Sequence, residues 1–181
     1  LEQKEEQLMQ LNQYTQHIKL IPGGVTAAKG FHAASTAAGI KYKNNRDDMA
    51  LIYSEKPCQA AGTFTTNIVK AAPVKWDKDI VINSPYAQAI VVNAGIANAC
   101  TGEEGFRYCS ETAKAAAESL IIPENSVLVA STGVIGMQLP MDKIAAGVKA
   151  MSPLLSETEE SGTKAAQAIM TTDTEKKEVA V

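Results

Sequence analysis

Short apolar runs bounded by turn residues recur along the chain and predict the strands of an α/β fold. Residues 127–130 read Val-Leu-Val-Ala and precede a hydroxyl- and glycine-rich turn, which is typical of a buried strand. Residues 89–92 are apolar throughout, which predicts a strand buried on both faces. Further strands are expected at residues 17–20, 49–53, 61–67 and 177–181.

Apolar residues at helical spacing predict three helices in the second half of the chain. The first starts near Thr101, which has capping-box spacing to Glu104. The second starts near Pro140, because proline's missing N–H costs least in a first turn. The third is expected over residues 163–170. The residues expected on buried faces are Phe106, Cys109, Ala113, Ala116 and Leu120 in the first helix and Ile144, Val148, Met151 and Leu155 in the second.

Residues 1–16 stand apart as an N-terminal extension. Leu1, Leu8 and Leu11 fall roughly on one helical face among Glu, Gln and Lys, so a helix is favoured over a loose tail. The extension lacks the apolar core of a secretory signal. No internal repeat is visible in residues 17–181, which are interpreted as one unit. The last strand predicted in this unit has just begun where the sequence ends.

Composition excludes several classes of protein. Apolar residues make up 45% and charged residues 20% of the 181 residues, an ordinary globular balance. The net charge of −3, without a Lys/Arg cluster, argues against a nucleic-acid partner, and no apolar run reaches the length of a membrane span. Three irregularly spaced cysteines and two histidines argue against a disulfide framework and a metal site, and favour a cytoplasmic location.

The candidate chemistry centres on the turn after the strand at 127–130, which reads Ser131-Thr132-Gly133-Val134-Ile135-Gly136. Glycine lets backbone N–H groups approach a ligand closely because it has no Cβ. The Thr132 hydroxyl and the Gly133 N–H would supply two donors at one point, which is what a developing oxyanion needs. An ordinary strand-to-loop turn has the same composition, so this motif alone leaves both interpretations open.

Other reactive side chains are weaker candidates. His32 stands beside an aromatic residue, which is more typical of a structural histidine than of a catalytic one. Cys109 falls on an apolar helix face and is interpreted as core. Cys100 precedes a helix N-terminus, which can lower the pKa of a thiol, but its apolar neighbours disfavour catalysis. The hydroxyl-rich residues 65–67 fit either an exposed strand face or ligand contacts, and Trp76 is expected in the core.

Six short motifs occur in the order found in the ornithine acetyltransferase (glutamate N-acetyltransferase) family, which the chain resembles from about residue 21 to residue 173. They are Pro22-Gly23-Gly24-Val25 with Ala27-Ala28, Thr65-x-Asn67 with Ala71-Ala72-Pro73-Val74, Val92-Asn93-x-Gly95, Ala97-Asn98-Ala99-Cys100-Thr101-Gly102, Ser131-Thr132-Gly133-Val134-Ile135-Gly136, and Ala168-Ile169-Met170-Thr171-Thr172-Asp173. One departure is Ile96, where the family usually has a polar residue, so a ligand contact there is in question.

The resemblance implies a fold and an assembly. Family members are made as one precursor that cleaves itself into an α and a β chain, and residues 17–181 look like the α-chain portion of this two-chain domain. The implied fold is a layered α-β-β-α sandwich of the N-terminal-nucleophile type, completed by the β chain. The implied assembly is a heterotetramer of two α and two β chains.

The resemblance also implies a reaction. The N-terminal Thr of the β chain is the nucleophile, and Thr132 and Gly133 match the oxyanion hole. Thr171 matches a substrate-contacting Thr. The acetyl group would pass from N2-acetylornithine to the nucleophile and then to glutamate, with no cofactor and no metal. Whether acetyl-CoA also donates stays open. The alternatives are a related self-cleaving aminopeptidase and a non-catalytic domain that binds a small ligand.

Overall fold

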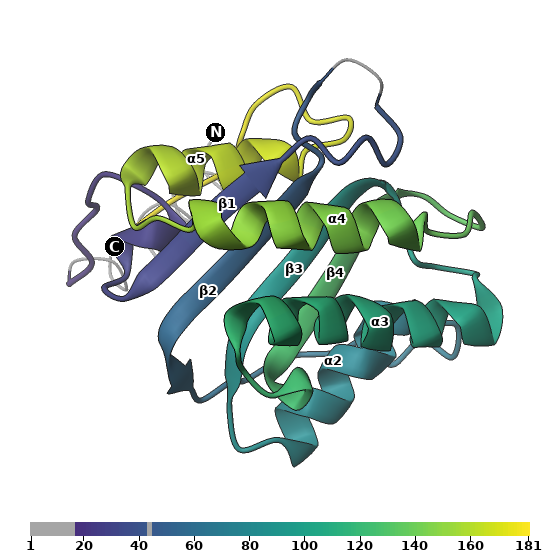
Figure 1. The fold of residues 1–181 in the computed structure, drawn as a ribbon. Helices are drawn as coiled ribbons and strands as arrows, with labels where there is room; N and C mark the ends of the chain where they lie inside the picture. Colours follow the sequence, from purple (N-terminus) through teal and green to yellow (C-terminus); the bar gives the residue numbers. More distant parts are fainter. Residues whose placement is uncertain (1–16, 43–44) are drawn as a thin grey trace, which may run out of the picture.

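A mixed four-stranded sheet forms the centre of the computed structural model, which describes residues 17–42 and 45–181 (Figure 1). The strands are β1 (Phe31–Thr36), β2 (Met49–Cys58), β3 (Ala87–Ile96) and β4 (Val127–Val134), in the order β1-β2-β3-β4. The pairs β1·β2 and β2·β3 are antiparallel and β3·β4 is parallel. The helices are α2 (Ala72–Asn83), α3 (Gly102–Leu120), α4 (Met141–Met151) and α5 (Glu159–Ala168), with short 3-10 turns η1 (Val25–Ala27), η2 (Glu124–Ser126) and η3 (Ser152–Leu154). The expected α/β class is confirmed, while the helix expected in residues 1–16 lies outside the described residues.

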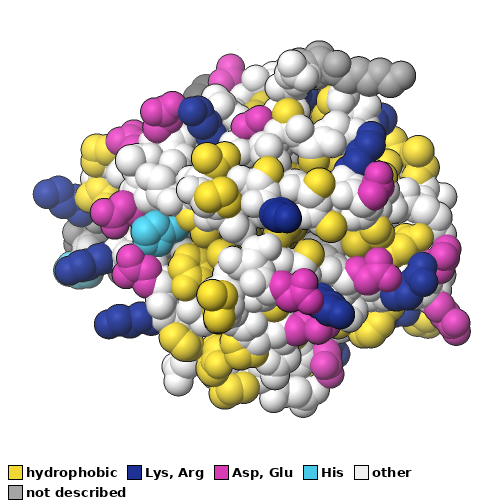
Figure 2. Space-filling view, in the orientation of Figure 1, with side chains coloured by type: hydrophobic (Ala, Val, Ile, Leu, Met, Phe, Trp, Pro, Cys, Tyr) yellow, Lys and Arg dark blue, Asp and Glu magenta, His cyan; other side chains and the backbone are white. Residues whose placement is uncertain are grey.

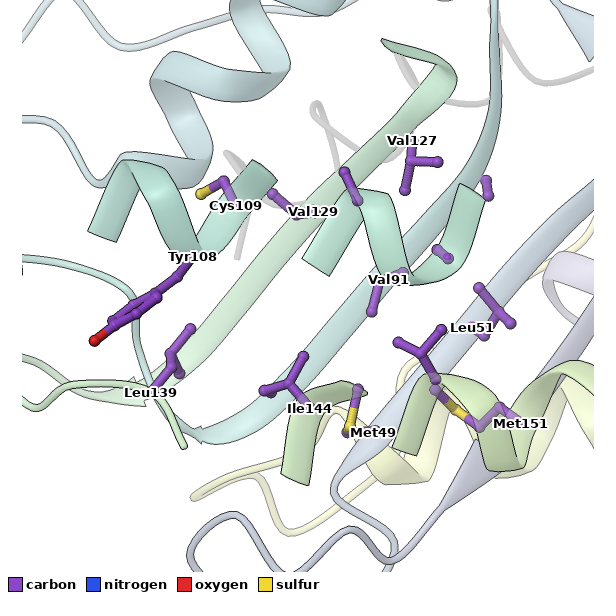
Figure 3. Close-up of a cluster of buried hydrophobic side chains, with 14 of the residues drawn as sticks. Met49, Leu51, Val91, Tyr108, Cys109, Val127, Val129, Leu139, Ile144 and Met151 are labelled. Atoms are coloured by element: carbon purple, nitrogen blue, oxygen red, sulfur yellow. The ribbon is translucent and has the colours of Figure 1, made fainter. Parts of the chain in front are cut away.

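One face of the sheet carries the main core, and we call it the major face. Side chains alternate between the two faces along a strand, so Leu51, Val91 and Val129, which are paired across β2, β3 and β4, share this face. They pack under α3 and α4 with Ile144 and Met151 (Figure 3). Burying one such side chain contributes about 1.5–3 kcal/mol, so this cluster is what holds the two helices on the sheet. The predicted apolar stripe is confirmed for Ile144, Val148 and Met151, whereas Leu155 lies after η3 and is only partly buried.

The opposite face is covered only in part by the described residues. Ala33 and Ala50 pack there against Ala165 and Ala168 of α5, over β1 and β2. Over β3 and β4 the same face presents apolar side chains that stay half-exposed, and we call this region the open face. Its residues are Ile90, Val92, Leu128 and Ala130. The prediction that strand 89–92 is buried on both faces is therefore wrong for the described residues, since Ile90 and Val92 stay half-exposed and only Val92 packs against the cluster that includes α5.

The outer edge of β4 is closed by side chains of α2. Trp76 donates its indole Nε1–H to the carbonyl of Val127 at 3.0 Å, and a carboxylate oxygen of Asp77 accepts the N–H of Val129 at 2.9 Å. An unpaired strand edge is a template for association with other chains, so these two contacts protect the sheet. Trp76 was expected in the core, but it is only half-buried and packs against the core from its margin. Helix α2 itself was not predicted. Pro73 would break the interior of a helix, but it occupies the first turn of α2, where proline is favourable.

Several predicted strands are wrong. Residues 61–67 form no strand because their polar side chains bond the local backbone: the Thr65 hydroxyl accepts the N–H of Asn67, and the Asn67 side chain accepts the N–H of Val69. Residues 17–20 are exposed and form no strand. Residues 177–181 contribute one bridge, between Ala180 and Ile21. The strands predicted at 49–53, 89–92 and 127–130 are confirmed, and each is longer than expected.

The starts of helices α3 and α5, and the buried face of α3, differ in part from those predicted by residue spacing. Thr101 precedes α3 as predicted, but its hydroxyl donates to Asn98 at 2.7 Å and does not cap the helix. Phe106 is 44% exposed and lies outside the core that holds Cys109, Ala113 and Ala116. Helix α5 begins at Glu159, four residues before the predicted start, because the Thr158 side chain caps its first turn.

The side of the molecule that carries α3 and α4 is not a basic face. Figure 2 shows acidic and basic side chains interspersed on the side of the molecule that carries α3 and α4. Within residues 17–42 and 45–181, none of the helices has the length and apolar character needed to span a bilayer.

Candidate functional site

The predicted turn lies at the carboxyl ends of the two parallel strands. Strand β4 runs further than expected, through Val134, so the motif begins inside the strand. In the register of β3 and β4, Ser131 pairs with Asn93, Thr132 with Ala94 and Gly133 with Gly95. The carboxyl edge of parallel strands is where α/β proteins place ligands, so the location suits a binding site.

Two glycines let the strand ends approach each other closely. Gly95 has φ +104° and Gly133 has φ +137°, both in the region that favours glycine. A Cβ on Gly133 would lie 2.3 Å from the carbonyl carbon of Gly95, which is closer than non-bonded carbon atoms can approach. The turn is then held by hydrogen bonds from Ala97 N–H to the Val134 carbonyl and from Gly136 N–H to the Ala99 carbonyl, both 2.9 Å. The local backbone therefore requires glycine at position 133.

Both proposed donors point away from the main core. By alternation along β4, Thr132 shares the open face with Leu128 and Ala130, and it is half-exposed. Residues 127, 129, 131 and 133 turn their backbone groups to the outer edge of β4, as the contacts of Val127 and Val129 with α2 show. The Gly133 N–H therefore lies on the edge that is not paired with β3, and Gly133 is exposed. A hydroxyl and an N–H are thus adjacent at one solvent-accessible point.

A buried side chain fastens the two strand ends beneath this point. Asn93 is 4% exposed; its Nδ2 donates to the Ile96 carbonyl at 2.8 Å, and its Oδ1 accepts the Ser131 hydroxyl at 2.6 Å. Both ends of the amide are satisfied, which is the requirement for a buried polar group. Asn93 and Ser131 lie on the major face, below Thr132. Sequence reasoning missed this pair, although Asn after an apolar strand is a signal of a specific hydrogen-bonding role.

Thr171 lies at the same end of the sheet through a chain of contacts. The Ala94 N–H, beside Thr132, donates to the carbonyl of Asp48 at 2.8 Å. Two residues earlier, Arg46 donates to the carbonyl of Met170, immediately before Thr171, at 2.5 Å. Thr171 itself is half-exposed in the segment that follows α5.

Asp48 is buried, although the polar and charged residues beside it in the sequence are typical of a solvated loop. Its side chain is 0% exposed, and its two carboxylate oxygens accept the N–H groups of Ala38 at 2.8 Å and Ile40 at 2.7 Å. A buried carboxylate needs such donors, and here they fold the loop back on β2. Sequence alone could not show these partners because they lie eight and ten residues away.

The other candidate side chains have structural roles or none assigned. The Nε2 atom of His32 is hydrogen-bonded to Oε1 of Glu55 at 2.9 Å, which is in line with a structural role. Cys109 is core as predicted: burial, together with the nearby charge of Asp77, raises the pKa of its thiol to about 12. Cys100 is exposed with φ +57° and borders a cavity of about 520 Å³ whose lining does not include Thr132. Over residues 17–42 and 45–181, no cluster of three or more His, Cys, Asp or Glu side chains is arranged to bind a metal ion.

The fold and the turn define a layered α/β protein with a hydroxyl–glycine donor pair at the end of a parallel strand pair. Comparison with known proteins then gives the family. Residues 32–181 match the model of the ArgJ family, and the chain belongs to this family.

Curated relatives and solved structures agree with this assignment. The chain is 50% identical over 161 residues to the arginine biosynthesis bifunctional protein ArgJ of Symbiobacterium thermophilum, covering 88% of this chain and 39% of that protein. It is 49% identical to the Gloeobacter violaceus protein of the same name, covering 89% of this chain and 39% of the relative. A crystal structure of ornithine acetyltransferase complexed with ornithine from Mycobacterium tuberculosis has 44% identity and a TM-score of 0.82, covering 86% of this chain and 83% of that one. The structure of ArgJ from Bacillus halodurans has 40% identity and a TM-score of 0.79, with 86% and 81% covered. The chain thus spans about 39% of the length of these curated relatives.

Proposed function

We propose that this chain is the α chain of a self-cleaving acetyltransferase of arginine biosynthesis. It would move the acetyl group of N2-acetylornithine to glutamate. The observation that carries the proposal is membership of the ArgJ family over residues 32–181, together with a crystal structure of an ornithine acetyltransferase bound to ornithine at 44% identity.

The chemistry follows from the donors at the end of β4. The N-terminal Thr of a β chain has its hydroxyl and its free α-amine on one residue, so the amine serves as base for its own nucleophile. An α-amine has a pKa of about 7.7–8.0, which leaves a useful fraction unprotonated near neutral pH. The hydroxyl oxygen attacks the acetyl carbonyl of acetylornithine, and the resulting oxyanion accepts hydrogen bonds from the Thr132 hydroxyl and the Gly133 N–H.

The remaining steps complete a ping-pong transfer. Collapse of the tetrahedral intermediate breaks the C–N bond, and the protonated amine of ornithine leaves. The acetyl-threonyl ester is then attacked by the amine of glutamate, which regenerates the free Thr. Thr171 contacts substrate in this scheme, and no cofactor or metal takes part.

The open face supports the two-chain arrangement. Ile90 and Leu128 are half-exposed apolar side chains on the part of the sheet face that the described residues leave uncovered. Exposed apolar areas of this kind mark interaction surfaces. A second sheet from the β chain would cover it and complete the four layers, with two copies of each chain in the heterotetramer.

The test uses the full-length protein. We expect it to purify as two chains, the second starting with Thr by N-terminal sequencing, and to form acetylglutamate from acetylornithine and glutamate. Hydrolysis of β-amino or D-amino peptides without acetyl transfer would instead support the related aminopeptidase. A single uncleaved chain, stable and inactive, would support the small-ligand-binding domain.

A further inference from the structure

The geometry points to Asn93 as a positioning residue that holds the oxyanion donors of Thr132 and Gly133 in place, an inference that rests on the proposed function. Asn93 connects the two strand ends through opposite ends of one amide. Its Nδ2 reaches the Ile96 carbonyl beyond the close approach of Gly95, and its Oδ1 holds Ser131, the residue immediately before Thr132.

Asn93 cannot itself contact substrate at the donor pair. It is 4% exposed and lies on the major face with Ser131, whereas Thr132 lies on the open face. The backbone of the sheet therefore lies between the Asn93 side chain and the Thr132 side chain. Any effect of Asn93 on the reaction must pass through the backbone.

The space around Asn93 leaves little room for a water molecule to replace a lost hydrogen-bond partner. The void among Asn93, Ser131 and their apolar neighbours measures about 10 Å³, at or below what one water molecule needs. The bond between Ser131 and Asn93 is short, and a lost partner would leave the amide oxygen buried and unpaired. The strand ends would relax to satisfy it, and because Gly133 has no clearance toward Gly95, the relaxation would displace the donors.

The test measures kcat, KM and stability in the full-length protein, with kcat divided by the fraction of chain that is cleaved. Ser131→Ala removes the hydroxyl that Asn93 holds, and Asn93→Asp removes the donor to Ile96 while keeping the acceptor. We expect each to lower kcat roughly tenfold with KM changed less than about twofold, since small misplacements of catalytic groups cost about this much or more.

Ser126, immediately before the start of β4, provides a matched control. Ser126 is 1% exposed and its hydroxyl donates to the Pro123 carbonyl at 2.6 Å, a bond like that of Ser131 but remote from the donors. Ser126→Ala is expected to lower the melting temperature while leaving kcat unchanged. A purely structural role for Asn93 predicts the same pattern for Ser131→Ala, which would overturn the inference.

A double-mutant cycle with Thr132→Ala separates the two proposals. If Ser131 acts through the donor pair, Ser131→Ala costs less activity when Thr132 is already Ala, whereas independent effects multiply. Multiplying effects would overturn the inference. If Thr132→Ala alone leaves kcat unchanged, the oxyanion assignment fails and the inference fails with it. If Thr132→Ala lowers kcat and neither Ser131→Ala nor Asn93→Asp does, only the inference fails.

Discussion

Ser131 and Thr132 are adjacent in sequence, yet their side chains lie on opposite faces of the sheet. Because side chains alternate along a strand, Ser131 lies on the major face, where it hydrogen-bonds Asn93, and Thr132 lies on the open face. One dipeptide thus serves both the support and the chemistry of the proposed site. This division explains why the two hydroxyls are not interchangeable.

Replacement of Thr132 by Ala is expected to lower kcat by about 10²–10³ and to leave folding nearly intact, because the half-exposed hydroxyl makes one catalytic hydrogen bond. The measurement is steady-state acetyl transfer alongside thermal unfolding of the full-length protein. Thr132→Ser, which keeps the hydroxyl, serves as the control and should retain most of the activity. Unchanged turnover in Thr132→Ala would remove this hydroxyl from the mechanism.

Asp77 makes stability depend on pH. Burial raises the pKa of its carboxyl from 3.8 to about 6, while the hydrogen bond from Val129 N–H opposes the shift. The folded protein then binds this proton more tightly than the unfolded chain, so the stability from this group is present below pH 4 and is lost as pH rises to about 6. Asp77→Asn keeps an acceptor for Val129 and removes the charge.

We therefore expect Asp77→Asn to gain about 1–2 kcal/mol relative to the wild type as pH rises from 4 to 6, after allowance for solvent reaching the half-buried group. Chemical denaturation of both full-length proteins across this range measures the difference. Asp77→Ala, which leaves the Val129 N–H without its partner, should instead be destabilised by about 1–3 kcal/mol. If the free energy of unfolding of the wild type and of Asp77→Asn changed equally with pH, this explanation would be wrong.

Single residues were predictable where their chemistry is local. The hydroxyl–glycine pair at 132 and 133 was identified because glycine and threonine stand next to each other after an apolar run. Asp48 and Asn93 were not identified, because each is defined by partners that only the folded chain brings near. Whether Thr132, Gly133 and Thr171 act as proposed stays a prediction.

At the scale of elements, the pairing of β3 with β4 depends on a glycine at position 133. Gly133→Ala would place a Cβ 2.3 Å from backbone atoms of Gly95 at φ +137°, so we expect a loss of at least about 3 kcal/mol and of activity. Gly136→Ala is the matched control, since it has φ +78° but no atom within 4 Å, and it should cost about 1 kcal/mol. Urea unfolding of the full-length variants compares the two. Equal losses would show that the close approach contributes nothing.

The elements that the sequence predicted share a strong internal pattern. Residues 89–92 of β3 and 127–130 of β4 are apolar runs, and α4 has an apolar stripe at helical spacing, so the sequence indicated these elements, although not the burial of both faces of β3. Helix α2 was missed because Pro73 looks the same before a helix as within its first turn. The strand expected at 61–67 failed because hydroxyl and amide side chains there satisfy the local backbone.

At the scale of the whole molecule, the open face predicts how the protein assembles. Leu128→Glu places a charge at its centre, where burial under a second sheet would cost several kcal/mol. We expect the full-length variant to remain uncleaved and without acetyl transfer, as seen by gel electrophoresis and assay. Ile121→Glu, at a position 92% exposed after α3, is the control and should cleave normally. Normal cleavage and assembly of Leu128→Glu would mean that the face stays in solvent.

Both outer edges of the sheet are occupied by groups that are not strands. Trp76 and Asp77 close β4, and Ser156 exchanges two backbone hydrogen bonds with Ala33 on β1. These contacts occupy part of each edge and so disfavour the addition of a strand, whereas the open face is available for a second sheet to stack on it. In the proposed two-chain protein, a nascent chain that has folded only this portion would expose the apolar open face but few free strand-edge groups, which limits one route to aggregation with neighbouring chains.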